Sequence, residues 1–225
     1  MLGIVVARNE WPLVGAAIAH ALTHHVDAVC VVDHASTDGT AEGLARLHQA
    51  WGERLRILRI DEDAFLQEAF NLAILEATRD LPHEWIYVFD ADEFLLAPGS
   101  GGLRGYLAGM AADVDAVRYR FDHLIAPRDL DPSQVAGLVD IRFRARNLDD
   151  AVPPIEPLME AIERGERTLF DVPFRSKLIA RRRKGRWPLA GAHDWRSPDP
   201  LCEHPAAVDE LRCAHLTYPN PARLR

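Results

Sequence analysis

Four short apolar runs within the first 90 residues limit the fold more than any other feature of this chain. They are LGIVVA, DAVCVVD, RLRILRID and EWIYVFD, at residues 2–7, 27–33, 54–61 and 84–90. The segments between them carry the apolar spacing of helices, at residues 11–25, 41–51 and 65–79. Strands that alternate with helices in this order form a doubly wound, mostly parallel α/β sheet.

The pattern changes after residue 102, where apolar and polar residues alternate at residues 115–124 and 137–146. This alternation is typical of half-buried antiparallel or mixed strands. A further strand is predicted at 175–183 and a short helix near 156–164. The second half of the chain is therefore expected to add a smaller group of mixed strands to the parallel sheet.

Loops are predicted where glycine, proline and polar residues gather, at residues 185–195 and 213–221. A length of 225 residues with 48% hydrophobic content suits one α/β domain with a sizeable core. We expect a single domain over residues 1–225, with a doubly wound half at 1–96 and a mixed-strand half at 97–225. The sequence leaves open whether this domain is part of a longer protein.

The charge of the chain is negative overall and unevenly distributed. The formal net charge is -8, which argues against nonspecific nucleic-acid binding as the main activity. Residues 61–93 carry ten acids and one base, whereas residues 175–186 carry seven bases and no acid. These two segments are interpreted either as two sides of one site or as two solvated faces.

The three cysteines, Cys30, Cys202 and Cys213, are too few for a disulfide framework. They favour a reducing compartment, so we expect a cytoplasmic protein, either free or peripheral to a membrane. No secretory signal is recognised at the start of the sequence. Its longest nearly continuous apolar stretch, at residues 11–22, is too short to span a bilayer.

Polar residues follow each predicted parallel strand, at the edge of the sheet where ligands bind in such folds. Asp90 and Asp92 follow the fourth strand, and their side chains converge if the strand continues to Asp92. Two convergent carboxylates suit a hard divalent cation with phosphate as co-ligand. Alternatively, these acids cap a following turn. Glu93 is interpreted as a structural or acceptor-side group.

Asp33 follows the second strand, and Asp38 lies in the next turn, HASTDGT. An acid at this point can accept hydrogen bonds from a ribose or a base edge. The alternative is an ordinary Asx-turn and helix N-cap. After the first strand the sequence reads ARNE, without the glycines of a dinucleotide-binding fingerprint, which disfavours that class of site.

Taken together, the segments VARNE, VVDHASTDGT and WIYVFDADEF resemble motifs of the family 2 glycosyltransferases, which have the GT-A fold. They are most like the branch with a K-N-E-like first motif and a D-x-D-E-F motif. RSKLIAR, AGAHDW and CAHLTYP resemble the later Lys, His and His-Tyr motifs of that branch. The resemblance implies a nucleotide-diphosphate sugar donor, with a UDP-sugar favoured, and Mn²⁺ or Mg²⁺ as cofactor. The donor would bind residues 1–96, and a glycan, lipid-linked or other acceptor would bind residues 97–225.

The resemblance also implies roles for individual residues. Asn9 and Glu10 would lie by the nucleotide, and Asp33 and Asp38 would hold its base and ribose. Asp90 would lie near the ribose or the metal, and Asp92 would ligate the metal.

Further residues in the later motifs have expected roles with stated alternatives. Asn71 matches an asparagine of the donor site, or is a helix residue with a structural role. Lys177 or Arg175 would add a cation for the diphosphate. His193 would supply a third metal ligand, with His215 as the alternative. Most of the basic run at 181–184 is interpreted as a solvated face.

An inverting transfer needs a carboxylate that removes the proton of the acceptor hydroxyl. The candidates are Asp122, Asp149, Asp150 and Asp194, of which Asp122 and Asp194 are the better placed in the sequence. The sequence thus predicts a metal-dependent, inverting glycosyltransferase. The non-enzymatic alternative is a degenerate nucleotide-sugar-binding module of a larger protein.

Two other enzyme classes and a zinc site are alternatives to this prediction. A haloacid-dehalogenase phosphotransferase would carry its D-x-D motif after the first strand, and a nucleotidyltransferase would carry a glycine-rich basic loop there. Cys202, His204, Cys213 and His215 form two C-x-H motifs, and two thiolates with two imidazoles can bind zinc. The one-residue gap is not a usual zinc-finger spacing.

Overall fold

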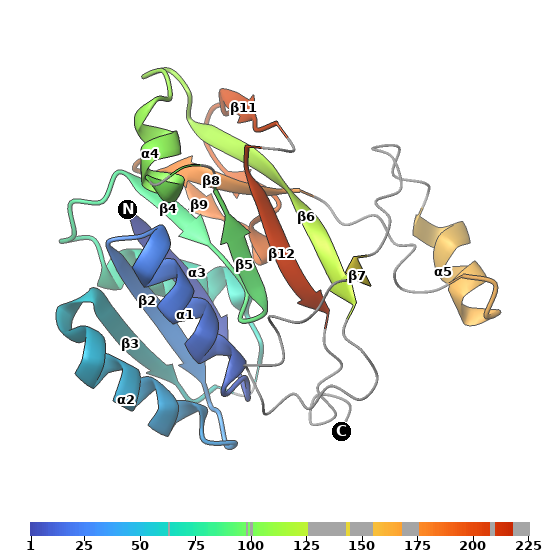
Figure 1. Ribbon diagram of the computed structural model, residues 1–225, viewed down its shortest axis with the longest axis horizontal. Helices are drawn as coiled ribbons and strands as arrows, with labels where there is room; N and C mark the ends of the chain where they lie inside the picture. Colours follow the sequence, from blue (N-terminus) through green and yellow to red (C-terminus); the bar gives the residue numbers. More distant parts are fainter. Residues whose placement is uncertain are drawn as a thin grey trace.

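The computed structural model describes residues 1–62, 64–97, 99, 101–125, 143–144, 155–167, 176–207 and 210–217. Its centre is a mixed sheet with the strand order β3-β2-β1-β4-β8-β6-β12-β5 (Figure 1). Two short strands, β7 and β11, pair with β6 beside this path, and β9 and β10 form a separate pair. The predicted α/β architecture is confirmed.

The four apolar runs form four parallel strands, as the sequence predicts. They are β1 (Leu2–Ala7), β2 (Ala28–His34), β3 (Leu55–Ile60) and β4 (Trp85–Val88). β1 lies between β2 and β4, and β3 lies at the edge beside β2. Every residue of β2 is buried, because helices cover both faces of this part of the sheet. All four strands point toward the same edge, so the segments that follow them lie close together.

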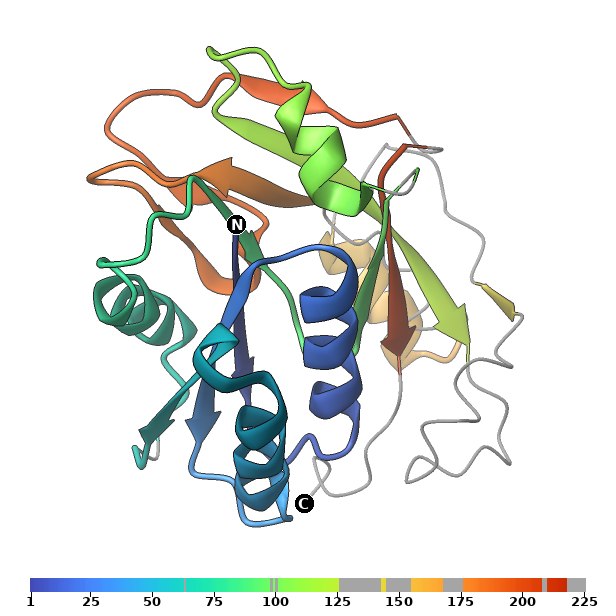
Figure 2. The same cartoon turned by 60° about the vertical axis from the view of Figure 1, so that its left-hand side comes forward.

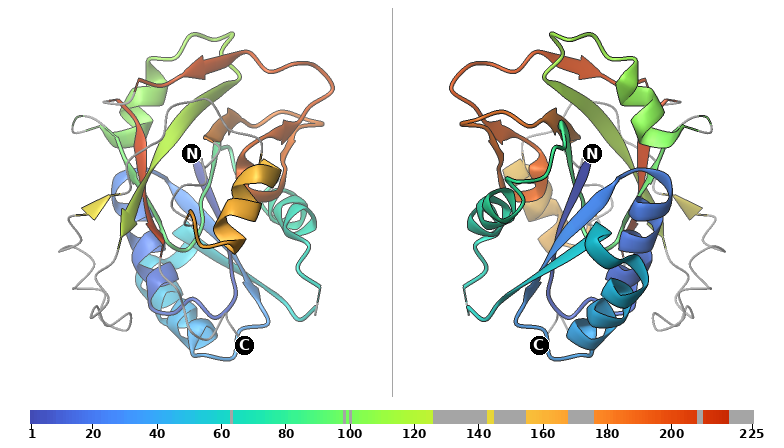
Figure 3. Two further views of the ribbon diagram at one scale, coloured as in Figure 1. Left: turned by 90° about the vertical axis from the view of Figure 1, so that its right-hand side faces the viewer. Right: turned by 90° about the vertical axis from the view of Figure 1, so that its left-hand side faces the viewer.

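Helices cover both faces of the parallel strands (Figures 2 and 3). They are α1 (Leu13–His24) and α2 (Thr40–Trp51) on one face and α3 (Gln67–Ala77) on the other. Ile18 of α1 and Leu44 of α2 belong to one buried cluster, and Phe70 and Ile74 of α3 belong to a second. The sheet thus separates two cores, which is what a doubly wound fold requires.

The second half extends the same sheet with strands of mixed direction. They are β5 (Glu93–Leu96), β6 (Ala116–Ile125), β8 (Lys177–Arg181) and β12 (Arg212–Thr217). β8 lies between β4 and β6 and is antiparallel to both. β12 runs parallel to β6 and antiparallel to β5. β8 therefore joins the parallel half of the sheet to the mixed half.

Short elements complete the described part of the second half. They are α4 (Gly102–Ala108), β7 (Phe143–Arg144), α5 (Ile155–Glu163), β9 (Trp187–Pro188), β10 (Trp195–Arg196) and β11 (Glu203–Pro205). The predicted helix near 156–164 corresponds to α5. Of the strand predicted at 137–146, only β7 lies within the described residues.

One sequence prediction is wrong: the loop predicted at residues 213–221 begins with strand β12. β12 is held on both sides by neighbouring strands, and Cys213 is fully buried between them. These pairings come from segments about 90 and 120 residues earlier in the chain, so a local pattern reading does not reveal them. The loop predicted at 185–195 likewise contains the two-residue strands β9 and β10.

His20 of α1 and His25, the residue that follows this helix, attach α1 to the start of the second half. The Nε2 atoms of His20 and His25 lie 2.9 and 2.8 Å from the carbonyl oxygen of Leu95 in β5. The N–H group of Leu103 in α4 donates to His25 Nδ1 at 3.4 Å, so His25 carries its proton on Nε2. Burial, together with the charge of His20, lowers the pKa of His25 to about 4.

This arrangement predicts a loss of stability in acid. A neutral His25 stabilises the fold fully above pH 6.5, the ordinary histidine value, and this contribution is lost as the pH falls toward 4. We expect the free energy of unfolding, measured in urea, to fall over this interval less steeply in His25→Gln than in the wild type. His24→Gln, on the exposed face of the same helix, is the control. Identical pH profiles for His25→Gln and the wild type would contradict the prediction.

Candidate active site

A cavity of about 670 Å³ opens at the edge of the sheet where β1 and β4 end. Its described lining comes from the end of β1, the segments after β1, β3 and β4, the first residue of α3 and one residue of β12. The lining residues are Val6, Arg8, Asn9, Glu10, Phe65, Gln67, Asp90, Ala91, Asp92 and His215. Four of the residues predicted from the sequence, Asn9, Glu10, Asp90 and Asp92, are thus brought together.

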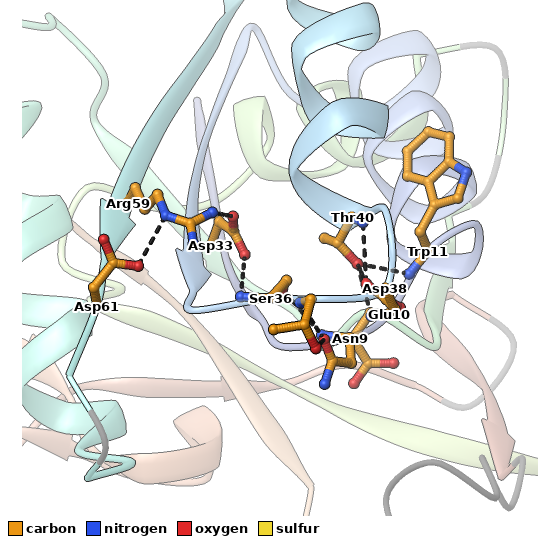
Figure 4. Close-up of polar contacts among 10 residues, drawn as sticks. Asn9, Glu10, Trp11, Asp33, Ser36, Asp38, Thr40, Arg59 and Asp61 are labelled. Carbon is orange, nitrogen blue, oxygen red and sulfur yellow. Dashed lines mark hydrogen bonds and ion pairs between the residues drawn. The ribbon is translucent and has the colours of Figure 1, made fainter.

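The segment after β1 is fastened to the turn after β2 (Figure 4). The N–H group of Asn9 donates to Ser36 Oγ at 3.0 Å, and Asn9 Oδ1 accepts a hydrogen bond from the N–H of Thr37 at 2.8 Å. Asn9 has a φ of 58°, a left-handed conformation that asparagine tolerates better than most residues. The Asn9 side chain therefore holds the shape of this edge as well as lining the cavity.

Thr40, at the start of α2, forms the second fastening in Figure 4. Its Oγ1 accepts hydrogen bonds from the N–H groups of Glu10 and Trp11 at 3.0 Å each and donates to Asp38 Oδ1. The N–H of Thr40 also donates to Asp38 Oδ1, at 3.0 Å. Asp38 thus accepts hydrogen bonds from the first residue of α2, which agrees with the capping alternative for this residue.

Asp33 lies at the end of β2 with a side chain that is 2% exposed. Arg59 Nη1 donates to it at 2.9 Å, and the N–H group of Ser36 donates at 3.2 Å. Arg59 also donates through Nε to Asp61 at 2.8 Å (Figure 4). Asp33 therefore binds the backbone of the following turn at the N–H group of Ser36, three residues on rather than two as in an Asx-turn, and Arg59 supplies its counter-charge.

The acidic motif DADE forms a turn, and the strand does not continue to Asp92. β4 ends at Val88, and the N–H group of Glu93 donates to the carbonyl oxygen of Asp90 at 3.1 Å. In the reverse direction, the N–H of Asp90 donates to Glu93 Oε2 at 3.1 Å. The expectation that Asp90 and Asp92 converge by strand alternation is therefore wrong, although both line the cavity from this turn.

Lys177 of β8 lies between two carboxylates of this turn. Its Nζ donates to Asp90 Oδ2 at 2.8 Å and to the two oxygens of Glu93 at 2.7 and 2.8 Å. The side chains of Lys177 and Glu93 are 1% and 2% exposed, whereas that of Asp90 is 42% exposed. Lys177 was expected to add a cation for the diphosphate. Its burial against the protein's own acids instead makes it the counter-charge of the turn.

The three groups of this cluster titrate together. Burial raises the pKa of Glu93 to about 7, with Lys177 opposing the shift and Asp90 adding to it. Burial alone would raise the pKa of Asp90, but the charge and hydrogen bond of Lys177 outweigh it and lower that pKa. Burial would lower the pKa of Lys177, but Glu93 and Asp90 raise it. The directions of these shifts keep Lys177 and Asp90 charged near neutral pH, and because the groups are coupled, the titration belongs to the cluster as a whole.

Asp92 is paired with a histidine of β12. His215 Nε2 lies 3.4 Å from Asp92 Oδ2, and His215 Nδ1 lies 2.9 Å from Nδ1 of His123. Burial would lower the pKa of His215, but the hydrogen bond and charge of Asp92 raise it. Burial and the neighbouring His215 lower the pKa of His123 to about 4. Asp92 and His215 thus form a carboxylate–imidazole pair that faces the cavity, with His123 behind the imidazole.

The described residues contain no group of three or more His, Cys, Asp or Glu side chains arranged to hold a metal ion. Asp92 and His215 nevertheless offer the carboxylate and imidazole donors that Mn²⁺ accepts. Both line the cavity, so a metal bound to them would have positions left for phosphate oxygens. The donor chemistry of this pair therefore fits a divalent metal that is completed by a bound diphosphate.

The two carboxylates expected to act as the base lie elsewhere. Asp122 and His123 are neighbours on β6, so their side chains point to opposite faces, and His123 is the one that contacts His215. Asp122 instead lies 3.6 Å from Arg212. Asp194 lines a separate depression of about 370 Å³ and lies 3.8 Å from Arg118. Neither is among the described lining residues of the first cavity.

Two other predicted site residues also lie away from the acidic turn. His193 Nδ1 is 3.3 Å from the carbonyl oxygen of Ser176, and the position beside Asp92 expected for His193 is taken by His215. Asn71 is completely buried in α3, where its Nδ2 lies 3.5 Å from the carbonyl oxygen of Pro188 in β9. The burial of Asn71 agrees with the structural alternative for this residue.

Two of the four residues of the basic run at 181–184 make structural contacts and the other two are exposed, so its interpretation as a solvated face holds for half of the run. Arg181 donates to the carbonyl oxygens of Val114 and Ala111, and Arg182 donates to those of Thr78 and Leu75 near the end of α3. Arg183 and Lys184 are exposed, and Arg175 lies outside the described residues.

The zinc alternative does not fit the structure. β11 pairs His204 with Val117 of β6, whereas β12 pairs His215 with His123 near the other end of that strand. Burial raises the pKa of the Cys213 thiol, which disfavours the thiolate that zinc needs.

Comparison with protein families identifies the chain. The model of the glycosyl transferase family 2 matches residues 4–121, which span most of β1, all of β2, β3 and β4, the acidic turn and most of β6. The chain belongs to glycosyl transferase family 2. A search of curated proteins gave no match.

Solved structures similar to this family 2 chain include a mannosyltransferase, PcManGT from Pyrobaculum calidifontis, in complex with GDP-Man and Mn²⁺. The two are 26% identical with a TM-score of 0.42, over 57% of this chain and 36% of that one. Another is S. aureus TarS in complex with UDP-GlcNAc, at 15% identity and a TM-score of 0.43, over 58% and 36% of the two chains. The alignments thus cover about a third of each of these structures. Because both TM-scores lie below 0.5, the family assignment rests on the sequence match.

Arg8, Phe65 and Gln67 line the cavity of this family 2 chain but were not selected from the sequence. Arg8 follows the first strand, and this position alone indicates the edge of the sheet where ligands bind. Phe65 was read as part of a helical pattern, although α3 begins only at Gln67. No helix in the described part of the chain is long and apolar enough to cross a membrane.

The Lys177 cluster predicts a large loss of stability in Lys177→Met, because this change leaves two carboxylates without their buried counter-charge. Breaking a buried ion pair typically costs about 3–5 kcal/mol of unfolding free energy. Lys184→Met, which changes an exposed lysine three residues after β8, is the control. Adding Glu93→Gln to Lys177→Met should restore part of the loss. Urea unfolding of the four proteins measures these differences, and equal stability of the two lysine variants would refute the prediction.

Proposed function

We propose that this chain transfers a sugar from a nucleotide-diphosphate sugar, preferentially a UDP-sugar, to an acceptor in a metal-dependent reaction that inverts the anomeric carbon. The observation that carries the proposal is the position of Asp92 on the cavity at the strand ends of a family 2 chain. Asp90 and Glu93 share Lys177, so Asp92 is the acid of this turn that lies apart from the lysine cluster. Two of the similar solved structures contain ligands of the proposed donor class: one contains GDP-Man with Mn²⁺, and the other contains UDP-GlcNAc.

The donor would lie along the ends of β2, β1 and β4. In this proposal, Asn9 and Glu10 line the nucleotide, and Asp33 and Asp38 lie at its base and ribose. Asp33 is bound to Arg59 and Ser36 in the structure, so contact with a ribose hydroxyl would compete with those hydrogen bonds. The expected order places the nucleoside toward β2 and the diphosphate toward the acidic turn.

Asp92 and His215 are the residues that would hold the metal. A bound Mn²⁺ or Mg²⁺ supplies a Lewis acid that stabilises the charge developing on the leaving diphosphate. To act as a ligand, His215 must first release the proton that Asp92 favours, since only the neutral imidazole binds metal. Metal affinity should therefore rise with pH.

The role expected of Lys177, a cation that binds the diphosphate, is proposed here for Arg8. Among the described lining residues of the cavity, Arg8 is the one lysine or arginine, and its side chain is exposed. An arginine binds phosphate oxygens through charge-assisted hydrogen bonds and stays charged at all working pH values. We assign Arg8 to the diphosphate of the donor.

Inversion is proposed on the family resemblance, and the base is not assigned. Asp122 and Asp194 lie away from the described cavity lining, which favours a second candidate function, a nucleotide-sugar-binding module without turnover. Hydrolysis of a UDP-sugar, measured with and without Mn²⁺, separates the two. Release of UDP in the presence of Mn²⁺ supports the enzyme, and binding without any release over a range of acceptors supports the module.

The first test of the proposal is the melting temperature of the protein with nucleoside diphosphates and Mn²⁺. A ligand that binds only the folded state stabilises it by RT ln(1 + [L]/Kd). We expect UDP with Mn²⁺ to raise the melting temperature more than UDP with a metal chelator. No response to UDP or GDP with Mn²⁺ would contradict the proposed function.

Asp92→Asn should weaken Mn²⁺-dependent binding of UDP by more than roughly 10-fold, which is the effect typical of losing even an outer-shell partner of a metal. The fold should be retained, because Asp92 lies at the surface of the cavity and outside the buried Lys177 cluster. Asp194→Asn, at the second depression, is the control. Calorimetric titration measures both, and an unchanged affinity in Asp92→Asn would exclude the ligand role.

Arg8→Gln should weaken binding of UDP by roughly 10-fold, the usual value of a charge-assisted hydrogen bond. Binding of uridine, which has no phosphate, should not change. Arg183→Gln removes an exposed arginine that is not among the lining residues, and it serves as the control. Equal losses for UDP and uridine would show that Arg8 does not act on the diphosphate.

A further inference from the structure

Phe65 is an exposed aromatic residue in a cavity that is lined mostly by polar residues. Its side chain is 59% exposed, the largest fraction among the exposed large hydrophobic residues of the described chain. It lines the cavity together with Arg8, Asn9, Asp90 and Asp92. An exposed large apolar surface in a ligand cavity indicates an interaction surface, since its burial by a ligand is favourable.

The ring of Phe65 is held in place from one side. Its centroid lies 5.9 Å from the ring of Phe70 in α3 and 5.7 Å from the ring of His34 at the end of β2. His34 is completely buried, and its Nε2 donates to the carbonyl oxygen of Glu62 in the same loop as Phe65. The segment after β3 is therefore fastened to the end of β2, which restricts the positions that the exposed ring can take.

The position of Phe65 in the fold indicates which part of a ligand it would meet. The sheet order β3-β2-β1 places β2 between the strand that precedes Phe65 and the strand that precedes Arg8. Arg8 and Phe65 line the same cavity, whose described lining includes no residue of β2. A donor with its diphosphate at Arg8 and the acidic turn would extend its nucleoside toward Phe65.

We propose that Phe65 is the platform on which the nucleobase of the donor stacks, an inference that rests on the function proposed above. A purine or pyrimidine ring presents a flat π-face to an aromatic side chain, and such stacking tolerates any base. Phe65 thus contributes affinity for the nucleoside without choosing between uracil and guanine. The choice between bases would come from polar groups such as Asp33.

The adjacent Leu66 provides a matched control. Its side chain is 55% exposed, nearly as much as that of Phe65, but it is not among the described lining residues. Phe65→Ala and Leu66→Ala therefore remove similar exposed apolar groups from one loop. Neither side chain is buried in the core, so both variants should fold, which circular dichroism and thermal unfolding can verify.

The experiment measures binding of UDP, GDP and inorganic pyrophosphate, each with Mn²⁺, to the wild type and the variants by calorimetry. In Phe65→Ala we expect roughly 10-fold weaker binding of both UDP and GDP, with pyrophosphate unchanged. Phe65→Tyr and Leu66→Ala should bind all three ligands like the wild type.

Three results would overturn the platform. They are unchanged UDP binding in Phe65→Ala, an equal loss for pyrophosphate, or an equal loss in Leu66→Ala. Weaker binding of UDP-glucose with unchanged binding of UDP would place Phe65 at the sugar, which also overturns it. If the wild type binds neither UDP nor GDP, the proposed function fails together with the platform. If the wild type binds both and Phe65→Ala does so equally, the platform alone fails.

Discussion

The buried contact of Lys177 with Asp90 and Glu93 is the interaction on which the site depends. Two carboxylates this close to each other, one of them fully buried, would repel each other and pay a large desolvation cost without a cation. Lys177 comes from β8, the strand that joins the parallel and mixed halves of the sheet. The counter-charge of the acidic turn is thus available only when both halves are assembled, so the site and the sheet form together.

The same contact explains why the acids of the turn differ. Glu93 is buried and closes the turn through the N–H group of Asp90, while Asp90 shares its charge with Lys177 and reaches the cavity. Asp92 lies on the other side of the turn, beside His215. One lysine therefore fixes two carboxylates and leaves the third for a histidine and a ligand. Three acids that look equivalent in the sequence have three different environments because of their partners.

Most of the first half of the fold could be predicted from the sequence, because β1, β2 and β4 are buried on both faces and appear as continuous apolar runs. The acids after β4 could be predicted for the same reason, since the end of a buried parallel strand is where polar residues collect. The sequence does not predict strand β12, the acids that Lys177 binds or the role of His215. Each depends on strands that pair across about 80 residues or more, and nothing in a local pattern records such a pairing. The sequence does not distinguish His193 from His215 for the same reason, since both are histidines in glycine- or alanine-containing segments.

The resemblance of the DADEF motif to a family signature can now be given a physical cause. A turn of four residues connects β4 to β5, and β5 pairs with β12 so that Glu93 lies opposite His215. Because β12 also pairs with β6, His215 is fixed relative to the turn by two strands, and its contact with Asp92 follows from that register. Inserting or deleting one residue in the turn would reverse the faces of β5, moving Glu93 away from Lys177 and Phe94 away from His20 of α1. The register of the sheet therefore constrains the spacing of the acids, independently of any ligand. A similar motif can persist wherever this pairing of β4, β5, β8 and β12 is kept.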